Sequence, residues 1–259
     1  MNRKEKIQSI RQLLANGQPT IGSWMQIPHP SVAEIMGQAG FDWIAVDMEH
    51  GSISVHQLPD IFRALELGGT LPLVRLARGH VKDCKLALDA GAGGVIIPMV
   101  ESAAQLIEVR NACCWPPTGT RGVGFSRANL FGQHFSSYFE EAQSPLIVAM
   151  IEHINAVEKL DEILQVKGLD AILIGPYDLS ASLGMTAKFE SLEFQDVMIR
   201  INDLSHAYCI PCGIHIVMPD QKEMEMRINE GYRFIAYSID AVFLNKSAKA
   251  PIPITHERG

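Results

Sequence analysis

The fold class that the sequence predicts is α/β, a TIM (β/α)8 barrel formed by a single domain over residues 1–259. Three observations favour it. Eight short apolar runs, typical of buried parallel strands, alternate with stretches of helical periodicity at a spacing of about 25 residues. Eight is also the strand count of this barrel. Several helical stretches end in glycine, which is common at helix C-termini. The competing doubly wound sheet is disfavoured, because the sequence has no early Gly-x-Gly-x-x-Gly loop.

The predicted elements alternate along the chain. The strands are Ile21–Ile27, Trp43–Asp47, Leu71–Leu76, Gly94–Met99, Leu146–Ile151, Ala171–Ile174, Gly213–Val217 and Phe234–Ser238. The helices between them are Ser31–Gln38, Val55–Leu67, Val81–Ala90, Ala103–Asn111, Ala156–Gln165, Phe194–Ala207 and Asp220–Glu230. The first 17 residues are predicted to form a charged amphipathic helix. A long irregular stretch, Trp115–Ser144, separates the fourth and fifth strands, and a loop of that length in a compact domain is usually functional.

Composition narrows the class of protein. Hydrophobic residues make up 47% and charged residues 20% of the chain, as in an ordinary globular protein with a large core. No signal-peptide or transmembrane run is visible, so we expect a cytoplasmic protein. The net charge of −7 argues against a nucleic-acid or membrane surface. The five cysteines are scattered, and the Cys209–Cys212 pair has no second pair with which to build a zinc site.

Polar residues stand at the ends of several apolar runs. Ligands of parallel α/β folds bind at the carboxyl ends of the strands, where these residues are expected to meet. One histidine, one arginine and two separated carboxylates there suggest a metal site beside an anion-binding arginine. The residues are Asp47, Glu49 and His50 after the second strand, Arg75 within the third, Glu152 after the fifth and Asp178 after the sixth.

Glu152 and Asp178 are the candidate metal ligands. They follow neighbouring strands, which lie about 4.8 Å apart, so their carboxylates are expected to share one divalent cation. Two carboxylates completed by water and a substrate oxygen suit Mg²⁺ or Mn²⁺. The alternative is structural, with Glu152 as the N-cap of a helix and Asp178 as a turn residue.

His50 and Arg75 are the candidate catalytic residues. Asp47 lies three residues before His50, and an Asp–His pair can orient an imidazole as a general base. The Arg75 guanidinium suits a carboxylate or an enolate oxygen, although an ion pair with Asp47 or Glu49 would also explain it. No lysine ends a central strand, which favours a metal over an imine as electron sink.

Two glycine-related patterns concern phosphate binding. The Gly-rich segment Gly119–Ala128 lacks the Walker lysine pattern, so we expect a flexible substrate loop or a subunit contact there. The loops after the seventh and eighth strands lack glycine, so the usual phosphate pocket of TIM barrels is not indicated.

Seven segments, in order along most of the chain, resemble the HpcH/HpaI family of class II, metal-dependent pyruvate aldolases. Two of them, the VDMEH sequence ending at His50 and the segment GPYDLSASLG, are quite specific. The segments are Gly22–Trp24, Ala39–His50, Pro72–Arg75, Asp89–Gln105, Gly119–Gly124, Ile151–Glu152 and Gly175–Gly184. The family's fold is a barrel of the phosphoenolpyruvate/pyruvate-domain type, which agrees with the barrel predicted above.

The resemblance implies a role for each matching residue. Glu152 and Asp178 would ligate Mg²⁺, Mn²⁺ or Co²⁺, which would chelate pyruvate. Arg75 would stabilise the enolate oxygen, and His50, oriented by Asp47, would act as acid/base through a metal-bound water. The substrate pocket would be lined by Trp24, Gly175, Pro176 and Tyr177.

The implied activity is a carbon–carbon lyase that cleaves or forms a 4-hydroxy-2-oxo acid from pyruvate and an aldehyde. Alternatives within the superfamily are a citrate-synthase-like enzyme, which joins oxaloacetate and acetyl-CoA, and an oxaloacetate decarboxylase. A non-catalytic metabolite-binding barrel is a third alternative. Family members often have Gln two residues before the metal glutamate, but this chain has Met150 there. Met150 has no amide to bind the pyruvate carboxylate.

The C-terminal region predicts a homo-oligomer. The last helix, Ala241–Asn245, is too short to cover the first and last strands, and its Phe243 and Leu244 would leave apolar surface exposed. The chain then ends in the proline-containing segment Lys249–Gly259. Family members pack this region against a neighbouring subunit, and the resemblance implies a hexamer built as a trimer of dimers.

Overall fold

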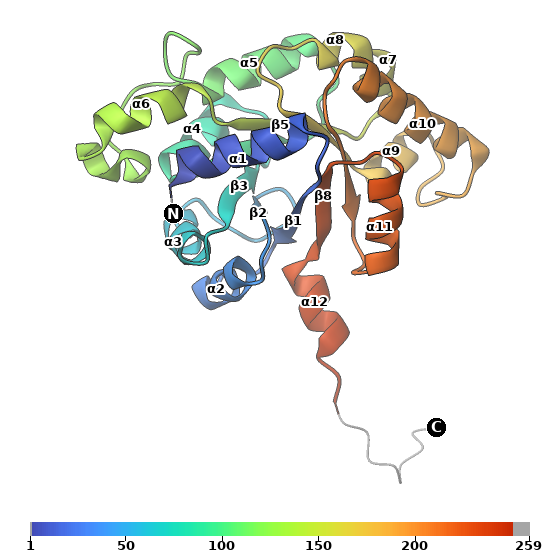
Figure 1. The fold of residues 1–259 in the computed structure, drawn as a ribbon, viewed down its shortest axis with the longest axis horizontal. Helices are drawn as coiled ribbons and strands as arrows, with labels where there is room; N and C mark the ends of the chain where they lie inside the picture. Colours follow the sequence, from blue (N-terminus) through green and yellow to red (C-terminus); the bar gives the residue numbers. More distant parts are fainter. Residues whose placement is uncertain (1, 251–259) are drawn as a thin grey trace.

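Eight parallel strands close into a barrel in the computed structural model, which describes residues 2–250 (Figure 1). Each strand pairs with the next in sequence, and the last pairs with the first. The predicted TIM-barrel fold is therefore confirmed. The strands are β1 (Thr20–Met25), β2 (Trp43–Asp47), β3 (Leu71–Arg75), β4 (Gly94–Ile97), β5 (Leu146–Ile151), β6 (Ala171–Ile174), β7 (Cys212–Ile216) and β8 (Phe234–Ile239).

Helices surround the strands, as the alternating sequence pattern predicts (Figure 1). No helix among residues 2–250 is long and apolar enough to cross a membrane. The helices are α1 (Arg3–Ala15), α2 (Pro30–Gln38), α3 (Leu58–Leu67), α4 (Val81–Asp89), α5 (Ala103–Cys113), the 3-10 helix η1 (Arg127–Gly132), α6 (Phe135–Gln143), α7 (Ile154–Glu158), α8 (Leu160–Leu164), α9 (Pro176–Ser182), α10 (Leu192–Ala207), α11 (Gln221–Asn229) and α12 (Asp240–Ser247).

The interior of the barrel is filled with apolar side chains. Trp43 on β2 stacks on Phe234 on β8, the two strands that flank β1, with 4.3 Å between ring centroids. Gly22 leaves the space for this indole, since a Cβ there would come within 2.1 Å of Trp43. The buried face of α1 joins the same cluster, because its apolar residues recur at helical spacing. The packed interior leaves the carboxyl ends of the strands as the place for polar chemistry.

Two predicted elements differ clearly from the structure, and one short helix was not predicted. The fourth strand ends at Ile97 rather than Met99, because Met99 has a φ of 48°, outside the strand region. The helix expected over Ala156–Gln165 is divided into α7 and α8 at Lys159, which has a φ of −106° and a ψ of 18°. The helix α9 was not predicted, because its seven residues are too few for a clear apolar period.

The long stretch Trp115–Ser144 is not irregular throughout, which corrects that expectation. It contains η1 and the nine-residue helix α6. Tyr138 and Ala142 lie four residues apart on α6, so both fall on one helical face and pack with the Trp115 indole. This small hydrophobic core is separate from that of the barrel, and it explains why the segment folds outside the barrel.

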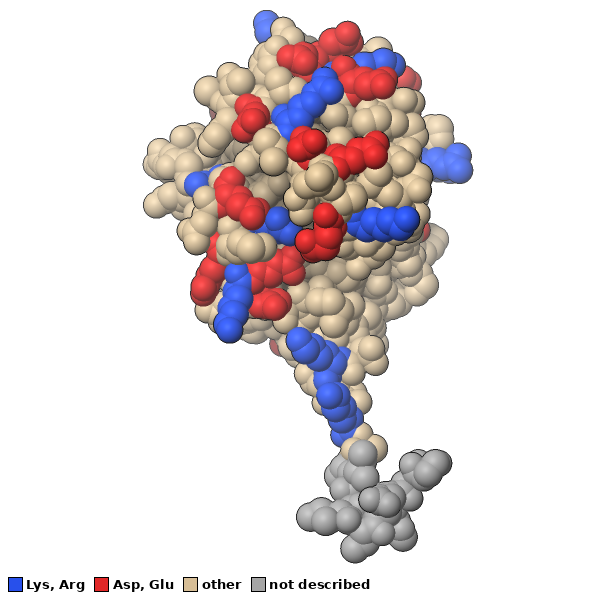
Figure 2. All heavy atoms as spheres, turned by 90° about the vertical axis from the view of Figure 1, so that its right-hand side faces the viewer, with Lys and Arg blue, Asp and Glu red and all other residues tan. Residues whose placement is uncertain are grey.

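Helix α12 projects from the end of the barrel instead of lying against its wall (Figure 1). Its main packing contacts are with β1 and β8. Figure 2 shows the projection from the side, with basic side chains along it. Leu244 on this helix is 58% exposed. The tail that was expected to follow lies, from residue 251 onward, outside the described residues.

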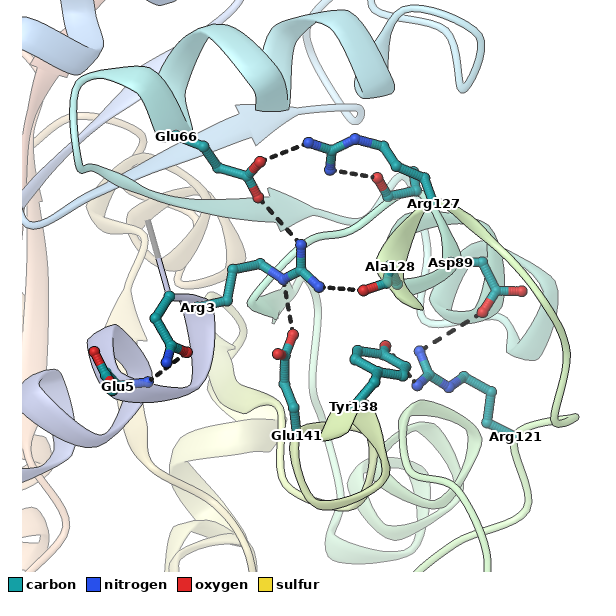
Figure 3. Close-up of polar contacts among 11 residues, drawn as sticks. Arg3, Glu5, Glu66, Asp89, Arg121, Arg127, Ala128, Tyr138 and Glu141 are labelled. Carbon is teal, nitrogen blue, oxygen red and sulfur yellow. Dashed lines mark hydrogen bonds and ion pairs between the residues drawn. The ribbon is translucent and has the colours of Figure 1, made fainter. Parts of the chain in front are cut away.

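A network of ion pairs joins α1 to the segment that contains η1 and α6 (Figure 3). The Arg3 guanidinium lies between two carboxylates, 2.8 Å from Glu141 and 3.2 Å from Glu66. Glu66 also pairs with Arg127 at 2.6 Å. A cavity of about 980 Å³ lies beside this network, and none of the candidate site residues lines it. We interpret the network as structural.

Replacing Arg3 with methionine is expected to destabilise the fold. Burial raises the pKa of Glu141, against the effect of the Arg3 charge, so this carboxylate would lose the cation that keeps it ionised. A buried group left without its partner typically costs about 1–3 kcal/mol. Urea unfolding of Arg3→Met measures the loss. Lys4→Met, which removes only an exposed pair with Glu140, is the control. Equal stability of the two variants would contradict a structural role for Arg3.

Candidate active site

A buried ion pair between Arg75 and Asp47 forms one side of the site. The two residues are direct neighbours in the register of β2 and β3. Arg75 donates to both carboxylate oxygens, through Nε to Oδ1 at 2.9 Å and through Nη2 to Oδ2 at 2.6 Å. Burial alone would raise the pKa of Asp47, but the hydrogen bond and charge of Arg75 hold it below its usual value. The expected ion pair is therefore present, with both side chains buried.

Arg75 has two further neighbours. Its guanidinium carbon lies 4.5 Å from the centroid of the Trp24 ring, a cation–π distance, and its Nη1 lies 3.3 Å from a Glu49 oxygen. Trp24 is 1% exposed, so it forms the floor beneath the guanidinium rather than an open pocket wall. Burial raises the pKa of Glu49 even though the Arg75 charge acts to lower it. Carboxylates on two sides and an indole below orient this arginine.

His50 lies in the exposed turn after β2. Asp47 Oδ1 accepts hydrogen bonds from the backbone N–H groups of Glu49, at 3.0 Å, and of His50, at 3.2 Å. Among the described residues, no hydrogen bond joins the Asp47 carboxylate to the His50 imidazole, so the expected pairing of the two side chains is corrected. Asp47 sets the backbone of the turn. Gly51 completes the turn, since a Cβ there would lie 2.2 Å from the Asp47 carbonyl oxygen.

Glu152 follows β5 directly and lies in the wall of the site, only 2% exposed. Its Oε2 accepts a hydrogen bond from the Met99 N–H at 2.9 Å. Its Oε1 lies against Gly175, where a Cβ would approach to 2.6 Å. Burial raises the pKa of Glu152 to about 7, and the negative charges of Glu49 and Asp178 add to the rise. The carboxylates of Glu49, Glu152 and Asp178 thus repel one another electrostatically in this region.

Asp178 lies on an exposed part of the rim, in the first turn of α9. The strand before it ends at Ile174, as predicted, and Asp178 follows it by a short helical turn. Gly175 is the N-cap residue and Pro176 begins the helix. Tyr177 is 49% exposed and its ring meets Phe189 edge-on. The first turn of α9 thus carries three of the expected site residues.

The structural alternative for Glu152 is wrong, because the N-cap of α7 is His153. The surroundings of Glu152 fit a divalent cation. A buried carboxylate beside two others is stabilised in its charged form by a cation, and carboxylate oxygens are ligands that Mg²⁺ and Mn²⁺ prefer. No cluster of three or more His, Cys, Asp or Glu side chains with metal-site geometry occurs within residues 2–250. Glu152 and Asp178 remain the predicted ligands of such an ion.

Three residues near the site were not predicted. Gln26 donates to Asp47 Oδ2 at 2.8 Å, and Met99 holds Glu152 through its backbone. His215, on β7, lies with its ring 5.5 Å from Trp24. Its Nε2 is buried without a hydrogen-bond partner among the described residues, as is the Trp24 Nε1. The sequence held a signal for His215, because this histidine interrupts the apolar run of the seventh strand.

The fold and the site match known proteins. The model of the HpcH/HpaI aldolase/citrate lyase family matches residues 20–246. A hydroxypyruvate/pyruvate aldolase of Roseobacter denitrificans is 35% identical over 252 residues, which cover 94% of this chain and 95% of the relative. A 4-hydroxy-2-oxovalerate aldolase of Novosphingobium aromaticivorans is 31% identical, with 93% and 92% covered.

Solved structures agree with this. An HpcH/HpaI aldolase/citrate lyase family protein from Burkholderia cenocepacia superimposes with a TM-score of 0.86 at 28% identity, covering 92% of this chain and 95% of the other. A citrate lyase beta subunit from M. tuberculosis, complexed with oxaloacetate and magnesium, has a TM-score of 0.57 at 17% identity and covers 86% and 93%; this likeness concerns the fold alone.

The barrel, its rim of acids and arginine, and these relatives define an enzyme of the carbon–carbon lyase class, of the aldolase type. The chain belongs to the HpcH/HpaI aldolase/citrate lyase family.

Acid is expected to destabilise the protein through His215. Burial, together with the charge of Arg75, lowers its pKa to about 3, whereas an unfolded histidine titrates near 6.5. Between these values the unfolded chain binds more protons, so the free energy of unfolding falls as the pH falls from 6.5 to 3. His215→Gln should reduce this slope by about 1.4 kcal/mol per pH unit, one proton.

Urea unfolding between pH 7 and 4 measures the slope for His215→Gln. His56→Gln, which removes an exposed histidine, is the control and should leave the slope unchanged. The same pH dependence in both variants would contradict a neutral, buried His215.

Proposed function

We propose that the protein is a divalent-metal-dependent aldolase that cleaves a 4-hydroxy-2-oxo acid into pyruvate and an aldehyde, or joins them. The observation that carries the proposal is the fixed guanidinium of Arg75 at the same rim as Glu152 and Asp178. A cation and a carboxylate pair that suits a metal can together stabilise the negative charge that develops on a 2-oxo group. The relatives named hydroxypyruvate/pyruvate aldolase and 4-hydroxy-2-oxovalerate aldolase support the substrate class.

Glu152 and Asp178 are the proposed ligands of Mg²⁺, Mn²⁺ or Co²⁺. When bound, the ion would supply Lewis-acid polarisation of the 2-oxo acid. Met99 contributes to the site by orienting the Glu152 carboxylate through its N–H group. Met150, which replaces the frequent glutamine, is 2% exposed and offers no amide for the substrate carboxylate.

The proposed roles of the other residues follow from the chemistry of cleavage. A base takes the proton of the 4-hydroxyl group, the bond between C3 and C4 breaks, and its electron pair becomes an enolate. Arg75 holds the negative charge of the enolate oxygen, and Asp47 keeps the guanidinium oriented. Exposed His50 is the group proposed to move the proton, since a neutral imidazole can both accept and return it. Protonation of C3 then yields pyruvate.

The substrate is expected to lie beside one wall of the rim and above a floor. The first turn of α9, from Gly175 to Tyr177, is proposed as one wall, and its glycine permits close approach to Glu152. Trp24 is proposed as the floor beneath Arg75. The aldehyde would extend toward the exposed side that carries Tyr177.

A screen for pyruvate release from 4-hydroxy-2-oxo acids tests the function. Turnover is expected to stop with EDTA and to return with Mg²⁺ or Mn²⁺. Glu152→Gln and Asp178→Asn should lose metal-dependent turnover and Mn²⁺ binding, measured by electron paramagnetic resonance, while retaining the fold. Glu158→Gln, an exposed change on α7, is the control. Unchanged metal-dependent turnover in either ligand variant would refute the metal assignment. Activity only with acetyl-CoA and oxaloacetate would identify a synthase instead.

His50→Ala is expected to lower kcat by about 10²–10⁴-fold, as removal of a positioned acid/base does. Arg75→Lys should cost about 10²–10³-fold, because an ammonium group cannot reproduce the planar fork that binds Asp47 and an oxyanion. Steady-state kinetics with the best substrate of the screen measure both. Near-normal kinetics of His50→Ala would rule out its role in proton transfer.

We also propose that the protein forms a homo-oligomer, a hexamer built as a trimer of dimers. The projection of α12 from the barrel, with Leu244 exposed, supports it, because apolar surface of this kind commonly packs against a second subunit. Light scattering at micromolar concentration should give a mass several times 28.5 kDa. A fully active species of 28.5 kDa would refute the proposal.

A further inference from the structure

A continuous set of hydrogen bonds connects the first residue of α12 with the catalytic arginine. It begins at Asp240, which is 4% exposed. Its Oδ1 accepts from the backbone N–H groups of Gln26 at 2.9 Å and Ala241 at 2.7 Å, and its Oδ2 accepts from Ile27 at 3.0 Å. One buried carboxylate therefore fixes the backbone just beyond the end of β1 to the start of α12.

Gln26 carries the connection into the site. Its backbone is held by Asp240, and its side-chain Nε2 donates to Asp47 Oδ2 at 2.8 Å. The same oxygen accepts the Nη2 group of Arg75. Gln26 is half-buried, and the fixed backbone restricts where its amide can point. Asp240 and Asp47 are thus linked through a single residue.

The position of Asp47 depends on these donors. Its Oδ1 is held by Arg75 and by the backbone of its own turn, at Glu49 and His50. Its Oδ2 is held by Arg75 and by Gln26. Gln26 is therefore the Oδ2 donor that does not move with Arg75. Because the pair is bidentate, rotation of the carboxylate plane would also rotate the plane of the guanidinium.

We propose that Gln26 is a positioning residue, through which the start of α12 holds Asp47 and thereby aims the Arg75 guanidinium at the reacting oxygen. The inference rests on the catalytic role proposed for Arg75. Gln26 acts through Asp47 and is not proposed to touch substrate. The main packing contacts of α12 are with β1 and β8, and the Asp240 carboxylate ties the start of this projecting helix to the backbone next to the site.

The first test is the kinetics of Gln26→Leu. Loss of this donor is expected to lower kcat by about tenfold or more, because a misaimed Arg75 stabilises the developing oxyanion less well. KM should change little, because a misaimed Arg75 weakens an interaction made mainly in the transition state. Gln26→Met, which keeps the unbranched chain, is the second variant in case the leucine does not fold.

A double-mutant cycle tests the link to α12. Asp240→Asn weakens the hold on the Gln26 backbone and should lower kcat in the same direction. If both act through the position of Asp47, the double variant Asp240→Asn/Gln26→Leu should lose little more kcat than the more damaging single change. Multiplicative losses in kcat would overturn the proposed link. Urea unfolding of each variant separates this readout from general stability, since a purely structural role would lower stability without changing kcat.

Gln18→Leu is the matched control. Gln18 is exposed, lies just before β1 at the opposite end of the barrel, and should tolerate the change with wild-type kinetics. Arg75→Lys separates the two proposals. If Arg75→Lys is inactive and Gln26→Leu retains wild-type kcat, the positioning role is wrong and the proposed function stands. If Arg75→Lys itself is near-normal, the role of Arg75 fails, and the positioning role falls with it.

Discussion

The bidentate ion pair between Asp47 and Arg75 is the interaction on which the rest of the rim depends. Both groups are buried, and removing either charge would leave the other without compensation, which is costly in a region of low dielectric constant. The register of β2 and β3 places Asp47 and Arg75 side by side, so the pairing of these strands also sets the geometry of the site. The turn after β2, the Trp24 ring and the Gln26 amide are all arranged around this pair.

The charges of the rim are unbalanced, and this suggests its chemistry. The negative charges of Glu49, Glu152 and Asp178 repel one another, while the Arg75 guanidinium is hydrogen-bonded to Asp47. Protonation of Glu152, with its pKa near 7, is one way to relieve the repulsion, and a divalent cation is another. The aldolase chemistry proposed for this chain needs the second. Neutral His215 beside Arg75 avoids adding a competing positive charge inside the barrel.

The rest of the barrel confines this chemistry to one end. The stacked Trp43 and Phe234 and the apolar face of α1 fill the interior below the rim. The ion pairs around Arg3 attach the segment with η1 and α6 to α1 and α3 (Figure 3). Helix α12 is different, because Asp240 at its start joins the network that ends at Arg75.

The sequence by itself determined the barrel, because buried parallel strands have long apolar runs, and it predicted the candidate site residues, because polar residues at the ends of such runs stand out. Strand bounds such as Trp43–Asp47 and Leu146–Ile151 were predicted without error. Only the tertiary structure decided which donor meets which acceptor. The Asp47 carboxylate binds the Arg75 and Gln26 side chains and the backbone of its own turn rather than the His50 ring. These partners come from neighbouring strands and from a turn, and no periodic sequence pattern predicts where such groups point. The raised pKa of Glu152 likewise arises from burial, which no local pattern records.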